Sequence, residues 1–286
     1  MAPGQTVANL VLTGLTADGD VCIRTGDGRF HVIVDVVATA PAAGYHPVLP
    51  ARLLDTRVGV GGSGPVAADE LVSLRVIGRA GVPGDATAVA LNLTATGADG
   101  TGYVTAWPCG PRPVASSVNL ARGATAANLL LVPVDADGDI CLQPTGASTE
   151  IVVDVQGYIG SGAAFTAQAP RRVLDTRPGA ATIDGMALGG GLVPAGEAIE
   201  VPIAGRAGLP ASSAVVVNVT ATGSSGVGYV TVWGCGVAPE ASTLNVAGEA
   251  AVPNAAIAEV SASGSICLRP AEASMHLIVD VIGTVG

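Results

Sequence analysis

The feature that most constrains this chain is an internal repeat. Four segments of a first copy return in the same order in a second copy, with identical or closely similar residues. The pairs are PARLLDTR (50–57) and PRRVLDTR (170–177), LNLTATG (91–97) and VNVTATG (217–223), GYVTAWPCG (102–110) and GYVTVWGCG (228–236), and IVVDVQG (151–157) and LIVDVIG (277–283). Agreement at so many separate places excludes chance, so the chain contains two copies of one structural unit.

A third copy is present, but only of the second half of the unit. The segment ANLVLTGLTADGDVCI (8–23) matches ANLLLVPVDADGDICL (127–142), and HVIVDVV (31–37) matches IVVDVQG. With the first half of the unit named A and the second half named B, the chain reads B-A-B-A-B. The repeat therefore predicts three parts, joined by connectors rich in Ala, Gly and Pro. They are an N-terminal half-repeat at 1–40, a full repeat at 50–160 and a second full repeat at 170–286, with the connectors at 38–50 and 159–170.

Short apolar runs separated by turn residues fill each unit. Aromatic residues make up only 3% of the chain, so Val, Ala and Leu must fill the core, and 40 Gly and 19 Pro provide frequent turns. Strand-length runs with such punctuation, and without a helical period, indicate an all-β fold. We expect tandem β-sandwich or barrel-like modules built of short antiparallel strands. Because the A and B halves are loosely alike, each resembling a small meander, a toroidal or propeller-like arrangement of half-units is the alternative.

The charge and hydropathy of the chain exclude several classes of partner. The net charge is −10, whereas binding to nucleic acid or to an anionic membrane surface requires a basic face. No apolar run reaches the roughly 20 residues that a membrane-spanning helix needs. Met1 leads directly into strand-like sequence with no signal peptide before it, so we expect a mature portion of a longer parent chain.

The order of the motifs resembles a known class of tandem repeat. LDTR, NxTxTG, GYVTxWxCG, a G-x-[IV]-C-L strand and IVDVxG follow one another in each unit. Similar units occur in secreted and cell-surface proteins of actinobacteria and other GC-rich bacteria, often in tandem or beside hydrolase domains. The resemblance covers essentially the whole chain and implies an extracellular or cell-surface location and modular use. It implies no reaction and carries over no catalytic residues.

The cysteines follow the repeat. Cys109 and Cys141 lie 32 residues apart in one unit, and Cys235 and Cys267 lie 32 residues apart in the other. In an extracellular setting this spacing predicts one disulfide per unit between the A and B halves, worth about 3–4 kcal/mol through the entropy of the closed loop. Four free cysteines in the core are the competing interpretation. Cys22 holds the B position of the half-repeat, where we expect it to be unpaired or bonded to another molecule.

One carboxylate of each B half lies within an apolar, strand-like run. The three are Asp35, Asp154 and Asp280. A buried carboxylate needs a cationic partner, because its desolvation otherwise costs several kcal/mol, and the planar guanidinium of Arg suits this pairing. A further repeated segment, GRAG, lies at 78–81 and 205–208. We expect structural ion pairs with the arginines of the LDTR and GRAG segments, which are Arg57, Arg177, Arg79 and Arg206. The catalytic alternative would set Asp55 or Asp175 opposite these carboxylates, as in glycoside hydrolysis.

Two aromatic pairs recur in the GYVTxW segments. They are Tyr103 with Trp107 and Tyr229 with Trp233. In a chain so poor in aromatics, each pair is either a platform for glycan stacking or the large anchor of its module's core. Asn92 and Asn218 form N-x-T sequons within strand-like runs, where we expect hydrogen bonds to neighbouring backbone rather than glycosylation.

Two further patterns suggest sites that the repeat argues against. VDADGDI (134–140) has the alternating carboxylates of a calcium loop, but its equivalent in the last unit, SASGSI (261–266), has none, so we expect a hairpin turn. His31 and His276 are equivalent, whereas Glu150 holds that position in the middle copy, which excludes a histidine mechanism repeated in each unit. We expect no metal, no cofactor and no catalytic residues.

These observations favour a non-catalytic extracellular module with a structural or adhesive role. Its units would extend, space or assemble, and the unmatched half-repeat would complete a sheet against another copy, since an unpaired edge strand is a template for strand addition. The alternative is a carbohydrate- or cell-wall-binding accessory domain that uses the aromatic pairs. The expected partners are another copy, a longer parent chain or an extracellular glycan, without nucleic acid and without a membrane span.

Overall fold

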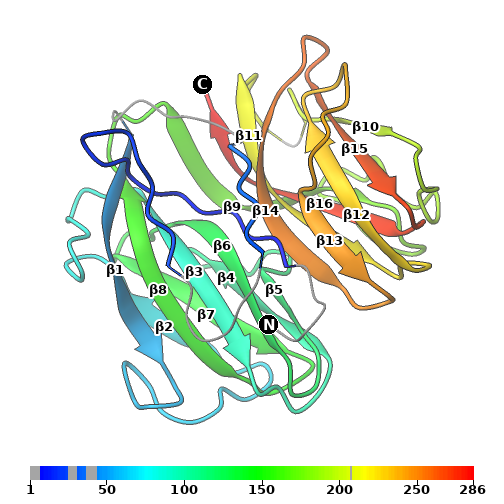
Figure 1. Cartoon of the computed structure of the whole chain (residues 1–286). Helices are drawn as coiled ribbons and strands as arrows, with labels where there is room; N and C mark the ends of the chain where they lie inside the picture. Colours follow the sequence, from blue (N-terminus) through cyan, green and yellow to red (C-terminus); the bar gives the residue numbers. More distant parts are fainter. Residues whose placement is uncertain (1–6, 25–30, 37–43, 207) are drawn as a thin grey trace.

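The chain folds into antiparallel sheets only. The computed structural model describes residues 7–24, 31–36, 44–206 and 208–286. Within these residues it contains sixteen β-strands, arranged in four sheets of four strands, and no helix. Figure 1 shows two β-rich bodies side by side, the first coloured from blue to green and the second from green to red. The all-β prediction is confirmed. The described part of the chain likewise has no helix that is long and apolar enough to cross a bilayer.

Module 1 spans residues 45–159 and consists of two sheets. Its strands are β1 (Tyr45–Asp55), β2 (Val72–Arg75), β3 (Ala88–Thr96), β4 (Gly102–Trp107), β5 (Val118–Leu120), β6 (Thr125–Pro133), β7 (Asp139–Thr145) and β8 (Glu150–Ile159). The long sheet has the strand order β1-β8-β3-β6, and the short sheet has the order β2-β7-β4-β5.

Module 2 spans residues 165–285 and repeats this architecture. Its strands are β9 (Phe165–Asp175), β10 (Ile199–Pro202), β11 (Ala214–Thr222), β12 (Val227–Trp233), β13 (Leu244–Ala247), β14 (Val252–Glu259), β15 (Ser265–Ala271) and β16 (His276–Val285). The long sheet has the order β9-β16-β11-β14 and the short sheet the order β10-β15-β12-β13, position for position as in module 1. Strands β1 and β9 begin inside the segments that were expected to be connectors.

Each module is a sandwich with a core of its own. Along β3, Val89, Leu91 and Leu93 point into the core while Asn92 points outward, the period of two expected of a strand with one buried face. Buried aliphatic side chains from the long and the short sheet pack together between the two layers, separately in each module. All four sheets are open, with distinct edge strands, so the modules are sandwiches rather than barrels.

The A and B halves are interleaved within a module. The A half of module 1 supplies β1 to β5, and the B half supplies β6 to β8. In the long sheet, the B-half strand β8 lies between β1 and β3, and in the short sheet the B-half strand β7 lies between β2 and β4. Sheet hydrogen bonds therefore run mainly between the halves. A separate meander for each half, and the toroidal alternative built on it, do not occur.

Interleaving also explains the N-terminal half-repeat. Its described residues, 7–24 and 31–36, contain no strand, although their sequence matches β6, β7 and β8. In module 1 those three strands all pair with strands of the A half. Both A halves of this chain already pair with their own B halves, so none is left for the half-repeat. The described residues of the half-repeat do keep a turn at the position of the one between β6 and β7. In it, Thr16 Oγ1 accepts the Asp20 N–H at 3.0 Å.

Candidate functional site

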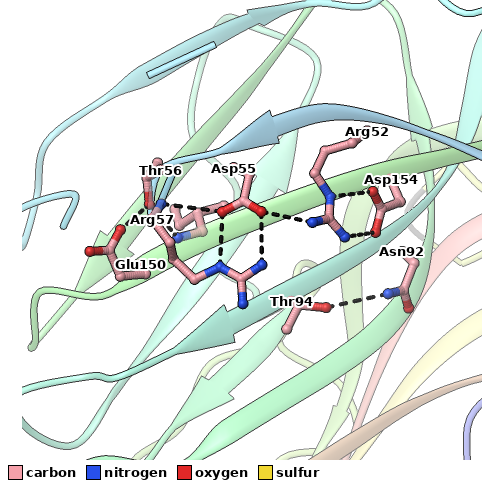
Figure 2. Close-up of polar contacts among 9 residues, drawn as sticks. Arg52, Asp55, Thr56, Arg57, Asn92, Thr94, Glu150 and Asp154 are labelled. Atoms are coloured by element: carbon pink, nitrogen blue, oxygen red, sulfur yellow. Dashed lines mark hydrogen bonds and ion pairs between the residues drawn. The ribbon is translucent and has the colours of Figure 1, made fainter. Parts of the chain in front are cut away.

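The LDTR segment of each module forms a row of alternating arginines and aspartates. In module 1, Arg57 binds the Asp55 carboxylate with two hydrogen bonds, of 2.9 Å from Nε and 2.7 Å from Nη2. Arg52 donates to the same carboxylate at 2.7 Å and binds Asp154 at 2.8 and 3.1 Å. Figure 2 shows this row from Arg57 through Asp55 and Arg52 to Asp154. It fastens the edge strand β1 to the B-half strand β8.

Module 2 repeats the row with Arg177, Asp175, Arg172 and Asp280. Arg172 binds Asp280 at 2.9 and 3.1 Å, and Arg177 binds Asp175 at 2.9 and 2.7 Å. The surroundings differ between the modules. The Asp280 side chain is 1% exposed, whereas the equivalent Asp154 side chain is 25% exposed. The Arg172–Asp280 end of the row is therefore covered in module 2, whereas the equivalent Arg52–Asp154 end is open in module 1.

One carboxyl group in each row has a pKa away from its ordinary value, and the two shifts have opposite directions. Hydrogen bonds from Arg57 lower the pKa of Asp55 to about 2. Burial raises the pKa of Asp280 above its ordinary value, although Arg172 beside it acts in the opposite direction. A general acid in glycoside hydrolysis needs a carboxyl group with a raised pKa that faces its substrate. Asp55 is held ionised and Asp280 is covered, so neither carboxyl group is placed for that role.

The arginines that pair with the B-half carboxylates are not the expected ones. Asp154 and Asp280 pair with Arg52 and Arg172, because the LDTR arginines bind the LDTR aspartates instead. A β-bulge explains the difference. The register between β1 and β8 shifts between Arg52 and Leu54, so Arg52 and Asp55 share a face although three positions separate them. Simple alternation along the strand would have placed them on opposite faces.

The GRAG arginines and Asp35 lie outside these rows. Arg79 donates to the backbone carbonyl of Leu53 at 2.8 Å. Arg206 is buried and binds Asp184 at 2.9 and 2.7 Å, which fixes the loop between β9 and β10. Asp35 is exposed, because residues 31–36 do not form the strand that buries its equivalents.

Both predicted disulfides are present. Cys109 bonds to Cys141 and Cys235 bonds to Cys267, with Cα atoms 4.9 Å apart in each pair. Each bond joins the segment after an A-half strand, β4 or β12, to a B-half strand, β7 or β15. The disulfides therefore lock the two halves of a module together covalently. Cys22 is free and exposed.

The aromatic pairs differ in accessibility. Trp107 is only 2% exposed and donates its Nε1–H to a backbone carbonyl at 3.2 Å, so it is a core anchor of module 1. Trp233 is half-buried, with the guanidinium carbon of Arg269 5.9 Å from its ring centroid. Tyr103 and Tyr229 are half-buried as well. Glycan stacking stays a prediction for these three rings, whereas Trp107 offers no free face.

The Asp-rich segment between β6 and β7 is a turn closed by a side-chain oxygen. Asp135 Oδ1 accepts the N–H groups of Asp137 and Asp139 at 2.9 and 2.8 Å. In module 2, Ser261 Oγ accepts the Ser265 N–H at 3.1 Å, so the turn needs an oxygen but not a charge. Among the residues that the structure describes, no group of three or more His, Cys, Asp or Glu side chains is placed to hold a metal ion.

The two modules meet at a junction centred on two asparagines. Asn128, on the edge strand β6, donates to Asn218 Oδ1 on β11 at 2.8 Å and accepts the Ala255 N–H of β14 at 3.1 Å. Asn218 in turn donates to the Ser116 carbonyl of module 1 at 2.7 Å. Both asparagines are buried. Buried amides with satisfied hydrogen bonds specify one geometry, because any displacement leaves polar groups unpaired.

An apolar contact flanks the asparagines. Leu131 of β6 clusters with Val216 and Ile282, which lie on the outer face of the long sheet of module 2. Phe165 packs against this cluster over Gly283, where a Cβ would come within 2.4 Å of the ring. The glycine that ends the LIVDVIG segment thus makes room for the ring. In this junction the edge of one sandwich rests on the outer sheet face of the next, as Figure 1 shows for β6 beside β9 and β14.

Module 1 carries the equivalent face, and no module covers it. A shallow hollow on this face is lined by Pro50, Arg52, Asn92, Asp154 and Gln156. Four of their repeat equivalents line the closed junction on module 2, namely Pro170, Asn218, Asp280 and Ile282. The candidate functional site is therefore the outer face of the long sheet. Module 1 covers this face in module 2, whereas no module covers it in module 1. We call it the module face.

The repeat pattern did not predict that asparagines join the two modules. It assigned Asn92 and Asn218 to contacts with neighbouring backbone, but Asn218 instead reaches across to module 1. No role was predicted for Asn128. A signal for it existed, because an asparagine holds the same position in all three B halves, as Asn9, Asn128 and Asn254.

Comparisons with known proteins do not identify the function of this site. No protein-family model matches the chain, and no curated protein matches it. Among solved structures, the chain is similar to the N-terminal CBM22-1-CBM22-2 tandem domain of Xyn10C from Paenibacillus barcinonensis. The identity is 12% and the TM-score 0.19, over 87% of this chain and 100% of that one. A likeness at this level carries no argument about function.

Proposed function

We propose that this chain is a non-catalytic structural segment of an extracellular or cell-surface protein, in which sandwich modules are stacked at fixed orientation. The buried asparagine junction carries this proposal. Asn128 and Asn218 join two separately folded cores through hydrogen bonds that have one geometry. A linker that only tethered the modules would need neither buried amide. Such a junction would hold the two modules together as one stiff body.

Two further features support this function. Each module is closed by its own disulfide, which suits a protein that works in an oxidising compartment. The carboxylates that a hydrolytic mechanism would use are instead engaged by arginines within the fold. Spacing or adhesion needs a stable, repeated shape, and the two modules offer the same strand order twice.

Glycan binding is the second candidate function. It would use Tyr229 and Trp233, which lie four residues apart on β12 and therefore share one face of the strand. Both rings are half-buried, and Arg269 beside Trp233 adds a cationic group at the same place. In module 1 the equivalent Trp107 is buried, so such a site would exist in module 2 only.

The proposed function is tested by loosening the junction. In the double variant Asn128→Ala/Leu131→Ser, both the amide bridge and the apolar contact are lost. We expect small-angle X-ray scattering to show the parent chain as one fixed pair of modules, and the variant as two modules with a larger maximum dimension. The matched control is Asn254→Ala, at the repeat position of Asn128 in module 2, because the Asn254 side chain donates to Thr243 within its own module. Scattering from the parent chain that requires freely moving modules would contradict the proposal.

A further inference from the structure

The module face of module 1 is already occupied by a small segment that imitates the junction. Asn9 Oδ1 accepts the Leu129 N–H at 3.3 Å, and Asn9 Nδ2 lies 3.5 Å from Asn92 Oδ1. These are the contacts that Asn128 makes in the closed junction, where it meets Ala255 and Asn218, the repeat equivalents of Leu129 and Asn92. The half-repeat thus places its own junction asparagine on the module face of module 1.

The apolar contact is imitated as well. Leu12, the repeat equivalent of Leu131, packs against the cluster that contains Ala90, and its carbonyl accepts the Tyr45 hydroxyl at 3.1 Å. Tyr45 lies over Gly157, as Phe165 lies over Gly283 in module 2. One short segment of the half-repeat therefore supplies both anchors of the junction.

This segment covers the face only in part. Asp154 stays 25% exposed where its equivalent is 1% exposed, and the hollow beside it remains open. Within the described part of the chain, the buried Oε1 of Gln156, which lines that hollow, has no hydrogen-bond partner. An unpaired buried acceptor costs free energy, so the face is suited to a larger occupant that brings a donor.

The complementary edge is displayed by module 2. Asn254 Nδ2 donates to the Thr243 carbonyl at 2.6 Å, as Asn128 Nδ2 donates to the Ser117 carbonyl at 3.0 Å. Asn254 is thereby held in the orientation that Asn128 has in the closed junction. Ile257 holds the position of Leu131; it is half-buried and also packs against the junction cluster beside Val216. Asn254 is 5% exposed. Module 2 thus carries on β14 the same asparagine and aliphatic pair that module 1 carries on β6.

We propose that copies of this chain join head to tail, the β14 edge of module 2 in one copy binding the module face of module 1 in the next. Asn254 takes the place of Asn9, with its Oδ1 accepting the Leu129 N–H and its Nδ2 donating to Asn92. Ile257 takes the place of Leu12. The inference rests on the proposed function, because it extends the same junction from within a chain to between chains.

The contact between copies is weaker than the contact within the chain. The module face of module 1 has Ala90 and Gln156 where module 2 has Val216 and Ile282, so less apolar surface is available to bury. An incoming copy also has to displace residues 8–12, which compete as part of the same chain. Because the two contact surfaces differ, a pair of bound copies still has one free edge at one end and one free face at the other. The assembly is therefore an open row or a ring, not a symmetric dimer.

Cross-linking tests this arrangement in the full-length chain. All variants carry Cys22→Ser, so that the natural free thiol cannot react. A copy with Asn92→Cys is mixed with a copy with Asn254→Cys and treated with a short bismaleimide. We expect a covalent dimer of the two. Replacing Asn254→Cys by Ser263→Cys, an exposed position at a different turn of module 2, is the matched control and should give no dimer. Asn9→Ala/Leu12→Ser in the Asn92→Cys copy should raise the yield, because it weakens the competing segment.

The scattering measurement of the parent chain separates this inference from the proposed function, because it needs no substitution in the junction. If the parent chain scatters as one fixed pair of modules and the mixed copies do not cross-link, the head-to-tail inference is wrong and the proposed function stands. If the parent chain scatters as freely moving modules, the proposed function fails, and the inference that rests on it fails with it. Equal dimer formation by the Ser263→Cys control would also overturn the inference, since it would show contact without specificity.

Discussion

Arg52 and Arg172 hold equivalent carboxylates in different surroundings. Each binds its aspartate with two hydrogen bonds, but Asp154 keeps contact with water and Asp280 does not. An ion pair near water contributes about 0–1 kcal/mol to stability. Removing one partner of a buried pair costs about 3–5 kcal/mol, because the other charge is left without compensation. The two modules thus provide a matched comparison within one molecule.

We therefore expect Arg172→Met to destabilise module 2 far more than Arg52→Met destabilises module 1. The losses should be about 3 kcal/mol or more and about 1 kcal/mol or less, since Met keeps the length of the side chain and removes only its charge and donors. Urea unfolding monitored by fluorescence measures both, because Trp107 reports on module 1 and Trp233 on module 2. Equal losses in the two modules would show that burial of the row does not decide its contribution.

Acid should also affect the two modules differently. In module 1 the pKa of Asp55 is lowered to about 2 by Arg57, and the pKa of Asp99 is lowered by hydrogen bonds from Ser148. A pKa lowered by folding gives stability that is complete above the ordinary value, about 3.9, and is lost as the pH falls toward 2. In module 2, Arg206 lowers the pKa of Asp184 to about 2, but the raised pKa of Asp280 makes protonation favour the folded state.

Module 1 is accordingly expected to lose more stability than module 2 between neutral pH and about pH 2, because protonation of Asp280 stabilises module 2 above about pH 3.9, before the losses from Asp55, Asp99 and Asp184 set in below it. Thermal unfolding at a series of pH values, followed in Trp107→Phe and Trp233→Phe variants so that each signal belongs to one module, measures the difference. Midpoints that shift in parallel in the two modules would contradict the assignment of these carboxyl groups.

At the residue scale, the sequence predicted covalent pairing better than polar pairing. The identical spacing of Cys109–Cys141 and Cys235–Cys267, together with the expected extracellular setting, favoured the two disulfides that the structure has, over four free cysteines. The partner of Asp154 was not predictable in the same way, because the bulge that turns Arg52 toward it depends on the pairing of β1 with β8 and leaves no periodic mark in the sequence. The role of Asn128 depends on the neighbouring module, which no single unit reveals.

At the scale of the elements, the positions of the strands were predictable and their neighbours were not. Apolar runs bounded by turns coincide with most strands, since alternation and punctuation are local properties. The neighbours depend on pairing between distant segments, and here β8 enters between β1 and β3 from the far end of the unit. The same non-local pairing leaves the half-repeat without strands although its sequence is that of β6, β7 and β8.

Hydrogen exchange should reveal this dependence directly. Residues 10–12 and residues 129–131 are repeat equivalents, but only the latter belong to a sheet. We expect the backbone amide of Leu130 to exchange orders of magnitude more slowly than that of its equivalent Val11. Along the edge strand β6 the Leu129 N–H points away from the sheet, so the Leu130 N–H points toward β3, and sheet amides exchange only when the module opens. Nuclear magnetic resonance or mass spectrometry can compare the two segments in one sample. Similar protection in both would mean that the half-repeat forms strands of its own.

At the scale of the whole molecule, the junction joins unlike surfaces. Module 1 contributes the edge of its sandwich, with Asn128 and Leu131, and module 2 contributes the module face, with Asn218 and Val216. Such a contact uses the edge of module 1 and the face of module 2. It leaves the face of module 1 and the edge of module 2 without a module against them. The proposed stiffness of the pair and the proposed association between copies thus rest on the same few residues.

The position of the junction asparagine has a consequence for the gene. Asn9, Asn128 and Asn254 stand at one point of the repeat, and each faces, or is placed to face, the unit that follows it. Recombination between two copies of the coding repeat, at a matching point, adds or removes one whole unit and keeps the junction asparagine at the seam. The number of modules in a chain of this kind is therefore a quantity that unequal crossing-over can change one unit at a time, with the junction asparagine already in place at each step.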